Sequence, residues 1–136
     1  MNYIDSALPI HAICDRGKVG EWARVVFGEI QKGELLACTS FLTFDEVFYK
    51  VRKMAGEAAA LESGEALLMT PNLRFIPVDD KVVWRALEMM KAQPLLPRDA
   101  IHAGTALLSD AQTVYSEDRD FDRIKGLRRI WYGMQP

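Results

Sequence analysis

The chain has 136 residues, 49% of them hydrophobic, and a formal net charge of −2. A chain of this length buries one ordinary core without disulfides or structural zinc, so we expect a single domain over residues 1–136. The near-neutral charge argues against broad electrostatic binding to nucleic acid, because such proteins usually carry a strongly basic surface.

The two cysteines, Cys14 and Cys38, form no Cys-x-x-Cys pair and have apolar neighbours, which indicates reduced thiols. The first expected strand begins at Asn2, with no charged segment, apolar segment or cleavage site before it. No apolar run approaches the roughly eighteen residues of a membrane span. We therefore expect a soluble, cytoplasmic protein.

The first third of the chain alternates between strand and helix patterns. Residues 2–7 predict a short strand that carries Asp5 near its end, and Pro9 begins a new element. Apolar residues at helical spacing predict a helix over residues 20–31. The apolar run at residues 35–39 is typical of a buried parallel strand.

The middle of the chain continues this alternation. Ser40 and Thr43 open a predicted helix that runs through Val51, and a second helix is expected over residues 57–69. Residues 73–78 predict a third strand, and Asp79 and Asp80 can cap the helix that follows it, over residues 79–90.

The last third adds a helix over residues 98–107, a strand at residues 113–116 and a final strand at residues 127–132. Strands that are separated by helices of ten or more residues imply right-handed crossovers. The fold class is therefore α/β, and we expect a three-layer sandwich with a mostly parallel central sheet and helices on both faces.

Four acids fall where a predicted strand ends or a predicted helix begins: Asp5, Glu46, Asp99 and Asp118. Ligands of open α/β sheets bind beyond the carboxyl ends of the strands, so these acids are candidates for one shared site. Carboxylates in contact repel one another unless a cation lies among them, and oxygen ligands favour Mg²⁺ or Mn²⁺ over zinc. Two further acids, Asp120 and Asp122, follow closely.

Each acid also has an ordinary structural explanation. Thr43-x-x-Glu46 matches a capping box, and Asp99 can cap a helix or favour its first turn. The segment from Asp118 to Asp122 can be a polar turn. His102 lies one helical turn after Asp99, and we expect it to be packed in the core or to support a ligand.

Four segments carry a family resemblance: Tyr3–Ser6, Thr39–Val47, Arg98–Ala103 and Ser116–Asp122. In this order and spacing they resemble the PIN-domain family, and within it the VapC-like toxins of toxin–antitoxin pairs. The resemblance implies a metal-dependent endoribonuclease, a homodimer and an antitoxin that blocks the site.

By position, Asp5 and Asp99 match the principal metal-binding aspartates of that family, and Glu46 and Asp118 match its two remaining acids. All four are therefore candidate catalytic residues and ligands of Mg²⁺ or Mn²⁺, and Asp120 or Asp122 can share the role of Asp118. Ser6 and Ser116 match small hydroxyl residues that line such pockets.

Basic residues beside the acids are candidate contacts for RNA phosphates: Arg98, Arg119 and Arg123. Aromatic and leucine side chains of the helices at residues 43–69 suggest a homodimer or antitoxin contact, or part of the core. Trp22, Trp84 and Trp131 lie on apolar faces and are expected in the core or at a dimer interface.

Two other functions remain open on the sequence. One is a PIN-like scaffold that binds RNA or protein without catalysis. The other is a receiver-type phospho-acceptor domain, which places adjacent acids after the first strand and a lysine after the last. Here Ser6 follows Asp5 and Gly133 follows the last strand, which disfavours the receiver.

Overall fold

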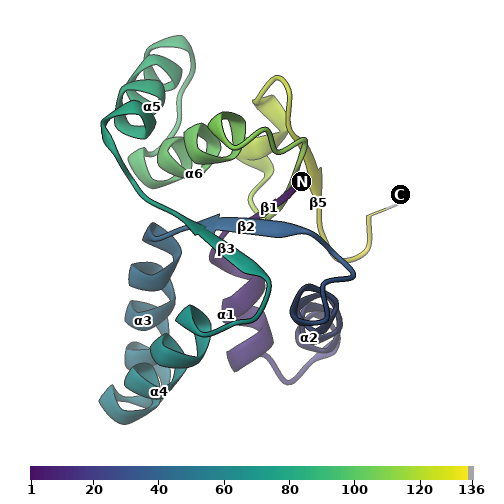
Figure 1. Cartoon of the computed structure of the whole chain (residues 1–136). Helices are drawn as coiled ribbons and strands as arrows, with labels where there is room; N and C mark the ends of the chain where they lie inside the picture. Colours follow the sequence, from purple (N-terminus) through teal and green to yellow (C-terminus); the bar gives the residue numbers. More distant parts are fainter. Residues whose placement is uncertain (135–136) are drawn as a thin grey trace.

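The structure is a computed structural model that describes residues 1–134 (Figure 1). Five strands form one sheet: β1 (Asn2–Ile4), β2 (Ala37–Ser40), β3 (Leu73–Ile76), β4 (Thr113–Tyr115) and β5 (Arg128–Ile130). Their order across the sheet is β3-β2-β1-β4-β5, and every neighbouring pair is parallel. This confirms the predicted parallel sheet.

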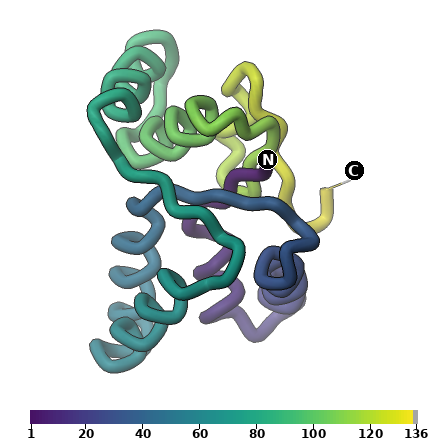
Figure 2. The backbone as a smooth tube through the Cα atoms, in the orientation of Figure 1, coloured from purple at the N-terminus to yellow at the C-terminus, as the bar shows by residue number. Residues whose placement is uncertain are grey.

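Six α-helices connect the strands: α1 (Ala7–Cys14), α2 (Lys18–Gln31), α3 (Leu42–Ala55), α4 (Glu57–Leu68), α5 (Asp80–Ala92) and α6 (Pro97–Leu108). A short 3₁₀ helix, η1 (Arg119–Arg123), lies between β4 and β5. Figure 2 shows α1 to α4 on one face of the sheet and α5 and α6 on the other. The predicted three-layer arrangement is therefore confirmed.

Each face of the sheet has its own hydrophobic cluster. Ile4 belongs to the cluster beneath α1 to α4, and the preceding residue, Tyr3, belongs to the cluster beneath α6. Successive side chains of a strand point to opposite faces, so one strand supplies both clusters. Both residues are fully buried, which makes β1 the centre of the core.

The strand order places a topological switch point between β1 and β4. The chain builds β1, β2 and β3 outward in one direction and then returns to add β4 on the other side of β1. Ligand sites of open α/β sheets lie outside the carboxyl ends of such strands. Receiver domains use the order 2-1-3-4-5, so the observed order is also against the receiver alternative.

Four predicted strands extend past their observed ends, by one residue in β4, two in β3 and β5 and three in β1. β1 ends at Ile4, because Ser6 and Ala7 already begin α1, which the sequence pattern did not predict. Pro9 is tolerated there because it lies in the first turn of the helix. β3 ends at Ile76 rather than at residue 78, since Pro77 has no amide hydrogen to donate to a ladder.

Trp22 packs in the core against Trp131, with ring centroids 5.0 Å apart, and it stacks on Tyr115. Trp84 differs, because 64% of its surface is exposed on α5, so the core alternative is wrong for this residue. On the helices at residues 43–69, Leu67 is buried in the core, whereas Tyr49 and Leu61 are exposed.

Gly20 in α2 lies against the chain that precedes its helix. A Cβ atom at this position would lie 1.9 Å from the carbonyl oxygen of Asp15, a distance that no side chain can occupy. Arg24, one turn later, donates to the same carbonyl at 2.7 Å. The link between α1 and α2 therefore requires glycine at position 20.

Cys14 and Cys38 are both free thiols, as predicted. Within residues 1–134, no helix combines the length and the apolar character that crossing a bilayer requires.

Candidate active site

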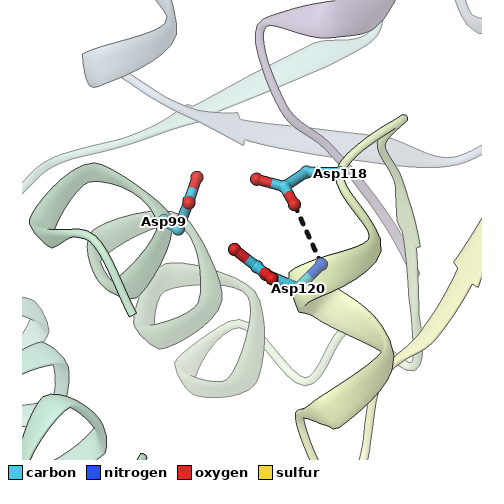
Figure 3. Close-up of side chains that lie close together, drawn as sticks. All are labelled: Asp99, Asp118 and Asp120. Carbon is cyan, nitrogen blue, oxygen red and sulfur yellow. Dashed lines mark hydrogen bonds between the residues drawn. The ribbon is translucent and has the colours of Figure 1, made fainter. Parts of the chain in front are cut away.

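Three carboxylates meet beyond the carboxyl ends of β1 and β4. Asp99 lies in the first turn of α6, and Asp118 and Asp120 lie in the segment that follows β4. One oxygen from each lies within 4.8 Å of the other two (Figure 3). The first turn of one helix and the end of one strand thus bring together acids that are distant in the sequence.

The backbone of the segment after β4 is held by its own side chains. The hydroxyl of Ser116 accepts a hydrogen bond from the Asp118 amide at 3.0 Å. Oδ1 of Asp118 accepts a hydrogen bond from the Asp120 amide at 2.9 Å (Figure 3). Asp118 is also the N-cap of η1. Its second oxygen remains directed toward Asp99, as Figure 3 shows.

Asp5 lies directly after β1, and only 7% of its surface is exposed. Its Oδ1 atom accepts the amide of Ala7 at 2.9 Å, which holds the carboxylate at the start of α1. Burial raises the pKa of Asp5 from its ordinary value of 3.8 to about 6, although His102, the Ser116 hydroxyl and the Ala7 amide oppose this rise.

Asp99 has a raised pKa for related reasons. Burial first, and then the charge of the neighbouring Asp118 carboxylate, raise the pKa of Asp99 from 3.8 to about 6. His102 acts against this rise, and Asp5 adds to it. Two carboxyl groups of this pocket are therefore costly to ionise together in the absence of a cation.

Glu46 is held by a buried chain of hydrogen bonds rather than by a capping box. Its Oε1 atom lies 2.5 Å from Nε2 of His102, and Nδ1 of His102 lies 2.6 Å from the hydroxyl of Tyr3. The N-cap of α3 is Phe41, without a side-chain cap, and Thr43 bonds instead to the hydroxyl of Thr39 at 2.6 Å. The capping-box explanation is thus wrong.

One neutral tautomer of His102 satisfies this chain of bonds. Burial raises the pKa of Tyr3 well above its ordinary value, so its hydroxyl stays protonated and can donate to Nδ1. Nε2 then carries the hydrogen that it donates to the Glu46 carboxylate. Neither the sequence spacing nor the composition identified Tyr3 as a partner of this histidine.

The remaining predicted site residues divide into those near the acids and those engaged elsewhere. Ser6 lies at the N-cap of α1, next to Asp5. Asp122 points away, because Arg129 donates to it at 2.9 Å and also donates to the carbonyl of Ser116. Of the two further acids, only Asp120 thus joins the cluster.

The three candidate arginines have different surroundings. Arg98, at the start of α6, lines a hollow together with Glu46, Asp99 and Asp118. Arg123 lies 3.8 Å from Asp120, and Arg119 is exposed at the start of η1. Arg98 therefore borders the hollow that contains Asp99 and Asp118, whereas Arg123 contacts Asp120.

The family model for the PIN domain matches residues 3–127 of the chain. No curated protein sequence matches the chain. Several solved structures share its fold. VapC20 of Mycobacterium tuberculosis, a toxin that cleaves the sarcin–ricin loop, superposes with a TM-score of 0.74 at 15% identity, over 90% of this chain and 93% of that one.

Two other similar structures come from toxin–antitoxin systems. VapBC of Salmonella typhimurium, solved bound to DNA, has a TM-score of 0.71 at 21% identity, covering 95% of this chain and 96% of that one. VapBC2 of Rickettsia felis, bound to a fragment of its promoter, has a TM-score of 0.71 at 19% identity, covering 96% and 99%. At these identities the likeness concerns the fold.

Proposed function

The chain belongs to the PIN-domain family, and from this premise we propose that it is a divalent-metal-dependent endoribonuclease of the VapC type, the toxin of a toxin–antitoxin pair. The observation that carries the proposal is the approach of the Asp99, Asp118 and Asp120 oxygens to within 4.8 Å of one another. Asp5 lies outside this group of three but is buried near enough for its charge to raise the pKa of Asp99, and we add it to the set of acids.

The donor atoms suit a hard cation. All four side chains offer carboxylate oxygens, which are the ligands that Mg²⁺ and Mn²⁺ prefer, and no cysteine or histidine belongs to the cluster. The raised pKa values of Asp5 and Asp99, caused first by burial, support the same conclusion, because a bound cation would stabilise the ionised carboxylates. We propose that Asp5, Asp99, Asp118 and Asp120 hold the ion.

A divalent cation at such a site supplies Lewis-acid activation of water and neutralises charge at the scissile phosphate. The protein adds a positioned base. Because Oε1 of Glu46 is bonded to His102, its Oε2 atom is available to orient the attacking water and to accept its proton. Arg98, which borders the same hollow, is placed to contact the phosphate.

We further propose an antitoxin as the protein partner, a homodimer as the assembly and the cytoplasm as the location. An apolar hollow between α1, α2 and α4, lined in part by Ile13, Phe27 and Leu67, offers a surface for an antitoxin segment. The proposal of an antitoxin is supported by the VapBC structures that share this fold.

The test is cleavage of RNA by purified protein free of any partner. Several single-stranded RNAs are incubated with millimolar Mg²⁺ or Mn²⁺, and matched samples contain EDTA. We expect cleavage with the cations only, and loss of cleavage in Asp99→Asn. Binding of the RNAs without any cleavage under either cation would favour the non-catalytic scaffold instead.

A further inference from the structure

A second hollow adjoins the acid cluster on the side of α3. It has a volume of about 450 Å³ and is lined by residues of α1, α3 and the start of α6: Ser6, Ile10, Asp45, Glu46, Tyr49, Lys50 and Arg98. Glu46 and Arg98 also line the hollow that contains Asp99 and Asp118, so the two hollows adjoin at these side chains. An RNA strand bound at the acids can therefore extend toward Tyr49.

We propose that this second hollow is a subsite for one unpaired nucleotide of the RNA, in which the ring of Tyr49 stacks on the base while Lys50 and Arg98 contact neighbouring phosphates. The inference rests on the proposed function and adds to it a position that selects single-stranded substrate. Its volume falls within the range of roughly 300–1,000 Å³ that is usual for small-ligand sites.

Tyr49 has the exposure and the position that stacking requires. Its surface is 63% exposed, although aromatic side chains usually bury most of theirs. Tyr49 is one helical turn after Asp45, and Lys50 is one turn after Glu46, so both pairs line the hollow. Aromatic side chains beside cations are the common means of binding unpaired bases, because every base has a π face.

The cations of this hollow are available to a ligand. Within residues 1–134, neither Lys50 nor Arg98 forms an ion pair with a carboxylate, whereas Arg52 and Arg129 each do. Lys50 lies one turn after Glu46, whose Oε1 atom is hydrogen-bonded to His102. Phosphate groups are therefore the natural partners of Lys50 and Arg98.

Asp45, the acid that faces only this hollow, is compatible with a bound nucleobase. Asp45 is exposed, and an ionised carboxylate only accepts hydrogen bonds, so it repels phosphate and favours the amino and imino groups of a nucleobase. The hollow thus contains an aromatic ring for the face of a base, an acceptor for its edge and two cations for phosphates.

The first test is binding, measured without cleavage. The anisotropy of a fluorescein-labelled ten-nucleotide single-stranded RNA is titrated with protein in EDTA at low salt. We expect Tyr49→Ala to weaken binding roughly 5- to 150-fold, as loss of one stacked base predicts. Tyr49→Phe should stay within about twofold of wild type, since it keeps the ring.

The matched control is Trp84→Ala, because Trp84 is 64% exposed and lies on α5, away from both hollows. It should bind like wild type.

A second pair of variants tests the phosphate contact. Lys50→Ala should reduce the slope of log K against log salt by about 0.7. Lys53→Ala, which changes an exposed lysine of α3 outside the hollow, should leave the slope unchanged.

The outcomes separate this inference from the proposed function. Equal binding by wild type, Tyr49→Ala and Tyr49→Phe would overturn the subsite, and cation-dependent cleavage by the same wild-type sample would leave the nuclease intact. A wild-type protein that does not bind the RNA at micromolar concentration overturns the subsite as well. If it also fails to cleave, the proposed function fails with it.

Discussion

Nε2 of His102 lies 2.5 Å from Oε1 of Glu46, and this contact joins α6 to α3 across the carboxyl edge of the sheet. The two helices lie on opposite faces, so the hydrogen bond ties the two outer layers together at the candidate site. Tyr3 of the central strand supports the ring from its other nitrogen. The position of Glu46 therefore depends on a residue buried in the core.

The first prediction concerns His102. We expect His102→Leu to reduce kcat/KM for RNA roughly 10- to 100-fold, as loss of an orienting partner usually does, since the Glu46 side chain loses its only hydrogen bond among residues 1–134. Tyr3→Phe keeps the bond to Glu46 and should lower activity less. A similar loss of activity in both variants, in proportion to their loss of stability on urea unfolding, would argue for a purely structural role.

The second prediction concerns metal binding. Millimolar Mg²⁺ or Mn²⁺ should raise the melting temperature, because an ion that binds only the folded state stabilises it by mass action. Asp5→Asn and Asp99→Asn should each remove most of that rise. Glu88→Gln on α5 changes an exposed acid outside the cluster and serves as the control. An undiminished rise in Asp5→Asn would count against Asp5 as a ligand.

The third prediction concerns pH. The pKa of Asp5 is raised from 3.8 to about 6 by burial, so between these pH values the folded state holds more protons than the unfolded state. Stability should therefore fall as the pH rises from about 4 to about 6. For Asp5 alone the loss amounts to roughly 3 kcal/mol. Asp99, whose pKa is also raised to about 6, acts in the same direction.

Urea unfolding in EDTA across this range measures the effect. The free energy of unfolding of Asp5→Asn should increase relative to that of wild type as the pH rises, because the variant has no carboxylate to ionise at that position. A constant difference between the two proteins from pH 4 to pH 7 would show that Asp5 ionises as freely in the folded state as in the unfolded one.

The fourth prediction separates two neighbouring acids. Asp120 belongs to the cluster, whereas Asp122 is engaged by Arg129. Asp120→Asn should weaken Mn²⁺ binding in calorimetric titration and reduce cleavage, and Asp122→Asn should leave both near wild type. The reverse order of effects would mean that the segment after β4 rearranges when the ion binds.

The fifth prediction compares two glycines of α2. Gly20→Ala should lower the free energy of unfolding by more than about 2 kcal/mol, because its Cβ atom would lie 1.9 Å from the Asp15 carbonyl oxygen. Gly28→Ala meets no atom within 4 Å and should stabilise the protein by up to ~1 kcal/mol through helix propensity. Equilibrium urea unfolding of both variants measures the contrast.

The order of strands and helices could be predicted from the sequence because periodicity and turn residues act locally. The helix at α5 is an example, since Asp79 caps it and accepts the amide of Val82 as its position predicted. α1 was missed because its eight residues are almost uniformly apolar and show no helical stripe. Its helical state depends on packing beneath the sheet.

The candidate site could be predicted only in part. The placement of Asp5 and Asp118 at the same edge of the sheet follows from the pairing of β1 with β4, and the sequence suggested this edge. The hydrogen bonds from Tyr3 to His102 and on to Glu46 join residues 99 and 56 positions apart, and no local pattern encodes such contacts. The same limit applies to the choice of Asp120 over Asp122.

The acids of the candidate site come from both ends of the chain, with Asp5 at the start of the fold and Asp118 and Asp120 near its finish. A polypeptide still emerging from the ribosome holds the first of them long before the last two exist. Any activity that needs all of them must wait until synthesis has passed β4 and this strand has docked beside β1.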